Sequence, residues 1–250
     1  MAATSIEWTD RSWNPTKGCS KVSKGCENCY ALTMAHRLEA MGSSGYLGTT
    51  VKRAGRVVWT GRVNIDHGAL ETPKTWKKPC RIFVNSMSDL FHESIGEDVL
   101  MAIWSTMSLT QQHVYQILTK RPERMLAILS DTSRFPILRN VWLGVSVEDQ
   151  ATMKRLDLLR KVPAAIRFVS LEPLIGPTPA IELSEIDWAI VGGESGPKAR
   201  AIKSIWIDEI FDSCRVNGTA FFFKQWGGVN KKKSGRIFRG QEWNEFPVAL

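Results

Sequence analysis

Arg81-Ile82-Phe83-Val84-Asn85 begins the stretch of sequence that decides the fold. A segment with apolar residues at helical spacing follows at 97–109, and a second apolar run follows at 114–118. Strand-length runs that alternate with helical segments predict a parallel sheet covered by helices. Since the runs are apolar almost throughout, we expect both faces of this sheet to be buried.

The alternation extends through the rest of the chain. Further strands are predicted near 6–8 and at 141–147, 166–171, 187–191 and 219–223, and further helices at 31–41, 150–161, 203–216 and from Pro122 onward. No glycine-rich phosphate loop stands at a strand–helix junction, which argues against an open nucleotide-binding sheet. We therefore predict an α/β fold, a partial (β/α) barrel of about six to seven parallel strands.

Residues 42–79 break this pattern. They are expected to form an inserted loop or a small hairpin around 57–63. The whole chain, 1–250, is predicted to be a single domain with a basic C-terminal segment, 224–250.

Composition limits the class of protein. The 250 residues are 43% hydrophobic, and 33 Lys and Arg against 25 Asp and Glu give a net charge of +8. This mixture excludes a disordered chain. No apolar run approaches the ~20 residues of a membrane-spanning helix, and the first residues lack the features of a signal peptide. We expect no membrane partner and a cytoplasmic location.

Positive charge is concentrated at the two ends of the chain. Residues 1–82 hold 13 Lys and Arg against 6 Asp and Glu, and residues 224–250 hold 6 against 2. The basic groups are Lys52, Arg53, Arg56 and Arg62 in the first region and Lys231, Lys232, Lys233, Arg236 and Arg239 in the second. Aromatic neighbours such as Trp59 and Trp226 indicate nucleic-acid binding. The alternative interpretation is a solvated face that keeps the protein in solution.

Polar side chains and glycines follow nearly every predicted strand. In a parallel barrel the chemistry lies at the carboxyl ends of the strands, so these residues are expected to line one mouth. They are Asn85, Ser86, Asp89, Thr119, Lys120, Ser146, Glu148, Ser170, Glu172, Gly192, Gly193, Glu194, Lys224 and Gln225. The paired glycines either let a ligand approach the backbone closely or form a tight turn.

Three of the five cysteines, Cys19, Cys26 and Cys29, stand within eleven residues. Cytosolic thiols rarely form disulfides, so this group indicates metal or redox chemistry. A [4Fe–4S] cluster held by three thiolates leaves one iron open to another ligand. A structural zinc site needs a fourth ligand, for which His36 is a candidate. A redox role without metal is the third interpretation.

A three-cysteine loop after the first strand of a partial (β/α) barrel resembles the radical S-adenosylmethionine (SAM) superfamily. The more specific segments are Trp8 to Pro15, Gly25 to Ala31, Phe83 to His92, Leu118 to Pro122 and Val191 to Gly196. Together they resemble the phage-associated three-cysteine-motif family of radical-SAM-like proteins over nearly the whole chain. The chain departs from the superfamily pattern in having six residues rather than three between its first two cysteines.

This resemblance implies that Cys19, Cys26 and Cys29 bind a [4Fe–4S] cluster whose fourth iron holds SAM. A reductant such as flavodoxin or ferredoxin would supply an electron, and SAM cleavage would yield a 5′-deoxyadenosyl radical that abstracts hydrogen from the substrate. The expected SAM-binding residues, most of them at strand ends, are Tyr30, Ser86, Asp89, Ser146, Glu148, Ser170, Glu172, Gly192 and Gly193. The expected substrate-binding residues are Trp13, Asn14, Lys120, Glu194, Lys224 and Gln225.

The substrate implied by the resemblance is a DNA base that is hypermodified in phages. One example is the rearrangement of an amino-acid-modified thymidine, which would make the enzyme an isomerase or mutase. Its location would then be the host cytoplasm. Two alternatives stay open: a radical SAM enzyme that acts on a small molecule or peptide, and a non-enzymatic nucleic-acid-binding protein held together by a metal.

Overall fold

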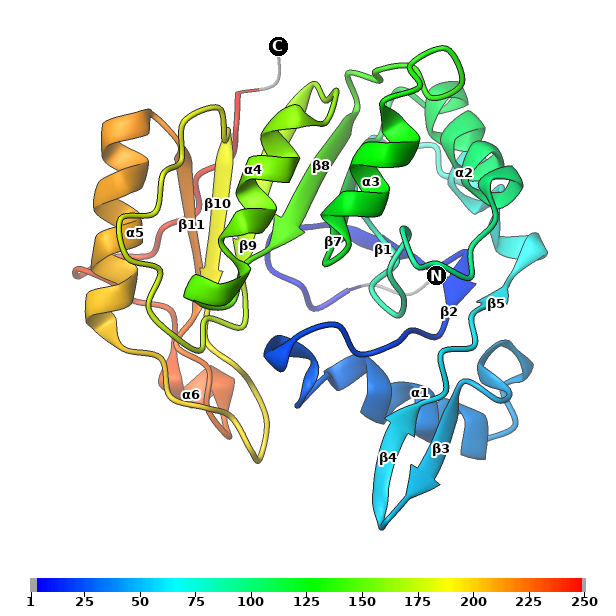
Figure 1. Ribbon diagram of the computed structural model, residues 1–250, viewed down its shortest axis with the longest axis horizontal. Helices are drawn as coiled ribbons and strands as arrows, with labels where there is room; N and C mark the ends of the chain where they lie inside the picture. Colours follow the sequence, from blue (N-terminus) through cyan, green and yellow to red (C-terminus); the bar gives the residue numbers. More distant parts are fainter. Residues whose placement is uncertain (1–3, 249–250) are drawn as a thin grey trace.

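A computed structural model describes residues 4–248, except for the side chains of Lys231 and Lys232. Seven parallel strands form one curled sheet, a half-barrel whose first and last strands do not pair within the described residues (Figure 1). In spatial order the strands are β1 (Arg11–Trp13), β6 (Arg81–Val84), β7 (Val114–Thr119), β8 (Val141–Ser146), β9 (Ile166–Leu171), β10 (Trp188–Gly192) and β11 (Ala220–Gln225). The predicted partial (β/α) barrel and its number of strands are confirmed.

Helices cover the convex face of the half-barrel. They are α2 (Glu97–Leu109), α3 (Pro122–Leu129), α4 (Lys154–Lys161) and α5 (Ser204–Asn217). Outward strand residues such as Ile82 and Val169 belong to the main apolar core with residues of these helices. The helix expected at 150–161 is divided, because Gln150–Thr152 is a 3₁₀ turn capped by Asp149. No helix within residues 4–248 is long and apolar enough to cross a membrane.

Aromatic rings fill the base of the concave face. Trp8, Phe83, Trp142, Phe168, Trp188 and Phe222 are buried together there. Side chains along a strand alternate between the two faces, so Ser170 lies on the same concave face as Phe168. Ser146 is the register partner of Ser170 on the neighbouring strand. The interior is therefore apolar at its base and polar toward the carboxyl ends of the strands.

The first strand corrects one prediction. The strand expected near 6–8 lies instead at Arg11–Trp13, and Trp8 lies in a turn with its ring in the aromatic base. Hydropathy alone does not distinguish a buried strand residue from a ring that closes the end of a barrel.

The segment between β1 and β6 carries small elements, of which α1 and the β3–β4 hairpin lie beyond the carboxyl ends of the strands (Figure 1). They are β2 (Thr16–Lys17) paired with β5 (Asn64–Ile65), α1 (Tyr30–Ala40), the hairpin of β3 (Thr50–Arg53) and β4 (Arg56–Trp59), and 3₁₀ turns at 24–26, 44–46, 67–69 and 72–75. A last short helix, α6, spans Lys231–Ser234. The inserted hairpin is confirmed, but it spans 50–59 rather than 57–63 because Ala54 and Gly55 make its turn.

Candidate functional site

The cysteine loop, residues 18–29, runs from β2 to α1 along the carboxyl edge of the sheet (Figure 1). All three of its cysteines are partly exposed. Cys29 occupies the N-cap position of α1, where the backbone N–H groups of Ala31 and Leu32 face its sulfur. Burial raises the pKa of the Cys29 thiol, whereas these N–H groups oppose the shift. Burial, with help from Asp89, also raises the pKa of Cys19 to about 12.

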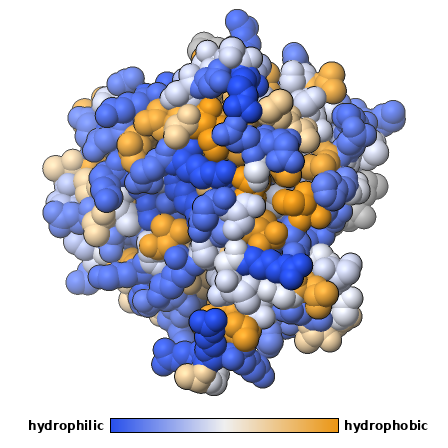
Figure 2. Space-filling model, turned by 45° about the vertical axis from the view of Figure 1, so that its right-hand side comes forward, coloured by the Kyte–Doolittle hydropathy of each residue, from blue (hydrophilic) through white to orange (hydrophobic). Residues whose placement is uncertain are grey.

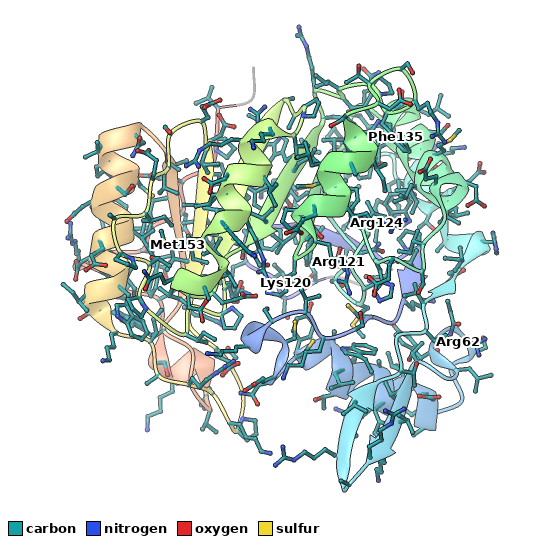
Figure 3. All side chains as sticks on the ribbon, in the orientation of Figure 1. Arg62, Lys120, Arg121, Arg124, Phe135 and Met153 are labelled. Atoms are coloured by element: carbon teal, nitrogen blue, oxygen red, sulfur yellow. The ribbon has the colours of Figure 1, made fainter. Side chains whose placement is uncertain are left out.

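Arg121 anchors the first part of the loop. Its guanidinium donates to Ser20 Oγ at 2.7 Å, to Asp89 Oδ2 at 2.9 Å and to Glu93 Oε2 at 2.9 Å. Asp89 also accepts the Thr119 hydroxyl at 2.7 Å. Figure 3 shows Arg121 beneath α3, on the side that faces the cysteine loop. Because Asp89 and Arg121 are almost completely buried, this pair holds Ser20, the neighbour of Cys19, in a low-dielectric setting.

His92 supports the same serine. Its Nε2 lies 2.9 Å from Ser20 Oγ, and its Nδ1 accepts the backbone N–H of Ser94 at 3.1 Å. Nδ1 therefore carries no proton, and Nε2–H donates to the serine hydroxyl. Burial and the nearby Arg121 charge lower the pKa of His92, which keeps the ring neutral.

Glu148 anchors the middle of the loop. Its Oε1 accepts Ser23 Oγ at 2.8 Å and the ammonium of Lys120, and its Oε2 accepts Arg155 at 3.0 Å. Burial opposes the charge of Glu148, but the two cations outweigh this effect and lower its pKa. A Cβ on Gly25 would stand 2.6 Å from Glu148 Cγ. Only glycine at this position lets the loop approach the carboxylate so closely.

Glu194 anchors the last part of the loop. Its Oε2 accepts Asn28 Nδ2 at 2.9 Å and Arg200 Nε at 2.9 Å. The same guanidinium reaches the Lys24 carbonyl at 3.1 Å. Burial opposes the charge of Glu194, but hydrogen bonds from Arg200 and Asn28 outweigh it and lower the pKa. The far end of the half-barrel is thereby linked to the residue that precedes Cys29.

Two carboxylates, Glu148 and Glu194, therefore bind the loop directly, and a third, Asp89, supports it through Arg121. Each of the three carboxylates is paired with an arginine. Asp89, Glu148 and Glu194 lie at the mouth, where the sequence predicted them, but their oxygens already bind protein groups. Their partners Arg155 and Arg200 were not predicted from the sequence, and Arg121 was expected at a strand end but without this pairing. The available signal was electrostatic, because a buried carboxylate requires a nearby cation.

A second group of predicted residues faces the concave interior. Ser170 is 1% exposed, and its Oγ is buried without a hydrogen-bond partner within the described residues. Glu172 and Lys224 form an ion pair of 2.5 Å close to Gly192. These residues offer hydroxyl, carboxylate and ammonium groups to a polar ligand.

Several other predicted residues serve the scaffold. Trp13 is 2% exposed in the main core and donates to the Ala69 carbonyl at 2.7 Å, which corrects its expected contact with substrate. The N–H of Gly193 donates to the Gln225 carbonyl at 2.9 Å, and a Cβ there would meet the Trp226 carbonyl at 2.1 Å. Only glycine fits at position 193, because any side chain would clash with the loop that follows β11. The N–H of Gly193 is already hydrogen-bonded and is not available to a ligand.

The remaining predicted residues connect neighbouring segments. Gln225 Nε2 donates to Ser195 Oγ at 2.6 Å. Tyr30 donates its hydroxyl to the Ser86 carbonyl at 2.7 Å, and the Ser86 hydroxyl reaches Asn14 Oδ1 at 3.1 Å. Tyr30, Ser86 and Asn14 thus join α1 to the ends of β1 and β6.

The donor chemistry of the loop fits an iron–sulfur cluster. Three free thiols stand in one loop at the carboxyl edge of the half-barrel. Within the described residues, no three His, Cys, Asp or Glu side chains are close enough to hold a metal ion, so a cluster would bind only if the three thiols moved closer together. The unpartnered hydroxyl of Ser170 likewise fits a polar cofactor in the concave space.

His36 does not fit the role of a fourth zinc ligand. Its Nδ1 lies 3.0 Å from Thr50 Oγ1 on the hairpin. Seven residues of helix separate it from Cys29, about 10 Å at 1.5 Å per residue. The zinc interpretation therefore loses the fourth ligand that the sequence suggested.

One comparison with known proteins gives a match. A family described as "Protein of unknown function (DUF5131)" matches residues 3–247. Neither the curated proteins nor the solved structures give a match.

Proposed function

The chain belongs to this DUF5131 family, and from its site we propose that it is a radical SAM enzyme acting on a nucleic-acid base. Cys19, Cys26 and Cys29 would be the ligands of a [4Fe–4S] cluster. When bound and reduced, the cluster with SAM supplies a 5′-deoxyadenosyl radical for hydrogen abstraction. The observation that carries the proposal is a three-cysteine loop held at the mouth of a half-barrel by one largely buried arginine and two buried carboxylates.

The chain's own residues position this loop and prepare the space beside it. Arg121, Glu148 and Glu194 fix the loop next to each cysteine, through Ser20, Ser23 and Asn28. The aromatic base keeps one end of the interior dry. The polar groups of SAM or substrate would bind to Ser170, whose hydroxyl has no partner within the described residues, and to the ion pair of Glu172 and Lys224.

A nucleic-acid substrate is supported by the charge. The chain carries a net charge of +8, and Lys52, Arg53 and Arg56 are exposed on the hairpin beyond the mouth. The finer proposal of an amino-acid-modified thymidine rests on the family resemblance alone. The electron would come from a flavodoxin or ferredoxin, also by resemblance.

The first test is electron paramagnetic resonance of the anaerobically reconstituted, reduced protein with and without SAM. We expect an iron–sulfur signal that changes when SAM is added. Cys26→Ser should lose this signal. Cys80→Ser is the matched control, because Cys80 lies beside His113 before β6, at the opposite edge of the sheet. An iron signal indifferent to SAM, or zinc in place of iron, would overturn the proposal.

The second test measures 5′-deoxyadenosine release with plain and hypermodified DNA. Release that increases only with nucleic acid supports a base as substrate. Release that responds to a small molecule or peptide instead, with no effect of any nucleic acid, would replace the proposed substrate class.

A further inference from the structure

The tip of the β3–β4 hairpin is the most concentrated uncompensated charge in the described structure. Residues 52–56 are all exposed, and Lys52, Arg53 and Arg56 make up three of the five. Residues 40–65 contain no Asp or Glu. No described side chain forms an ion pair with any of these three cations. Figure 2 shows strongly hydrophilic residues at the bottom of the molecule, where Figure 1 places this hairpin.

The hairpin register brings two of the cations together. Arg53 pairs directly with Arg56 in the ladder, so both side chains lie on one face of the ribbon. Like charges in directly opposed positions destabilise a hairpin. The turn nevertheless keeps the two arginines opposite each other. Ala54 and Gly55 both have positive φ, as a tight two-residue turn between twisted strands requires.

Two basic residues near the C-terminus, Arg236 and Arg239, differ from these cations in having acidic partners. Arg239 pairs with Asp208 at 2.8 Å and Asp212 at 3.1 Å, and Arg236 pairs with Glu242 at 3.7 Å. Their charges are neutralised inside the molecule. The cations at the hairpin tip have no such partners among the described residues, so they are available to an external anion.

The base of the hairpin is fixed to the cysteine loop. Trp59 packs against a small core that contains Ala31 and Ala35 of α1, and Cys29 packs against the same core. Thr50 donates to Glu39 of α1 at 2.7 Å. An anion bound at the hairpin tip is therefore held at a set position relative to the mouth.

We propose that the β3–β4 hairpin binds the sugar–phosphate backbone of duplex DNA and holds the duplex beside the mouth. This inference rests on the proposed function and names the element that receives its substrate. A two-stranded ribbon fits the major groove of B-form DNA, whereas the major groove of A-form RNA is too deep and narrow for side chains to enter. Residues 52–56 include no aromatic side chain on which the bases of a single strand could stack.

The test is fluorescence anisotropy with an unmodified 20-base-pair duplex and the full chain at 50–200 mM NaCl. The variant Lys52→Gln/Arg53→Gln/Arg56→Gln should bind at least about tenfold more weakly at 50 mM NaCl. The slope of log Kd against log salt should flatten by up to about 2.7, because each lost phosphate contact contributes about 0.9. The midpoint temperature of thermal unfolding should be at least as high for the variant as for the wild type, because the repulsion between the arginines is removed.

The matched control removes the same charge from the opposite edge of the sheet. Lys77, Lys78 and Arg139 are exposed residues that precede β6 and β8, and Lys77→Gln/Lys78→Gln/Arg139→Gln should leave binding unchanged. Equal losses in both variants, or no loss in the hairpin variant, would overturn the inference. The inference would also be overturned if the hairpin variant lost binding to single-stranded RNA or to anionic vesicles but bound duplex DNA as tightly as the wild type.

The binding assay uses unmodified duplex and contains no SAM, so its result does not depend on the test of the proposed function. A hairpin-dependent duplex complex without SAM cleavage would sustain the hairpin inference and remove the enzyme. If the protein cleaves SAM but does not bind duplex DNA, the proposed radical SAM chemistry would stand and the hairpin inference would be overturned.

Discussion

Arg121 shows how much of the site depends on one side chain. It connects Asp89, Glu93 and Ser20, and its Nη1 lies 4.0 Å from the Cys19 sulfur. Its side chain is 10% exposed and that of Asp89 is 8% exposed. The Asp89 carboxylate therefore depends on this guanidinium, and on protein hydrogen bonds, more than on water for its stabilisation.

We predict that Arg121→Gln costs about 3–5 kcal/mol of unfolding free energy, because it leaves the Asp89 carboxylate buried without its cation. Iron content after reconstitution should also fall, since Ser20 loses an anchor. Urea unfolding and iron analysis measure the two effects. Arg134→Gln is the control: its pair with Glu97 is about half exposed and is worth roughly 0–1 kcal/mol. Equal losses in both variants would show that burial does not set the value of the pair.

At the scale of elements, α1 joins the cysteine loop to the hairpin. It begins directly after Cys29, and its other end binds the hairpin through Glu39 and His36. The helix therefore connects the hairpin to the cysteine loop. His36 belongs to the hairpin side of this connection and not to the thiol side.

We predict that His36→Gln leaves the metal content of the reconstituted protein unchanged, because a glutamine can still hydrogen-bond to Thr50. Cys29→Ser in the same assay should lose most of the bound metal. Inductively coupled plasma analysis of iron and zinc gives both values. A large loss of zinc in the His36 variant would restore the zinc interpretation.

On the scale of the whole molecule, the buried carboxylates make stability depend on acid. Opposing burial, nearby cations hold the pKa values of Glu148 and Glu194 below their usual value of 4.5. A carboxyl group whose pKa is lower in the folded state stabilises the fold at any pH above its unfolded pKa. This stabilisation is lost as the pH falls toward the folded pKa.

We therefore predict an unfolding free energy that decreases slightly between pH 7 and about pH 5.5, because His92 is protonated more readily in the unfolded chain than in the fold. The free energy should decrease further below about pH 4.5, where the carboxylates are protonated. The decrease should approach about 1.4 kcal/mol per pH unit for each such group. Glu148→Gln should be less stable at pH 7 but should show a shallower decrease with acid. Urea titrations at pH 7, 5.5, 4.5 and 3.5 test this, and a stability that increases on acidification would contradict it.

Local patterns in the sequence were sufficient to predict the sheet and the mouth. Apolar runs such as Arg81–Val84 and Val141–Ser146 formed parallel strands because apolar residues on both faces require cover from both sides. Polar residues after these strands lie at one edge because parallel strands end together. The sequence also predicted that a three-cysteine loop would stand beside them.

Only the tertiary structure decided what those polar residues bind. Ser23 meets Glu148 across 125 positions of the chain, and Asn28 meets Glu194 across 166. It also decided that Trp8 closes the base of the barrel and that Arg53 faces Arg56 across a turn. Periodicity specifies the face on which a side chain lies. Its partner depends on the path of the whole chain, because the energy of a buried charge is set by its neighbours in space.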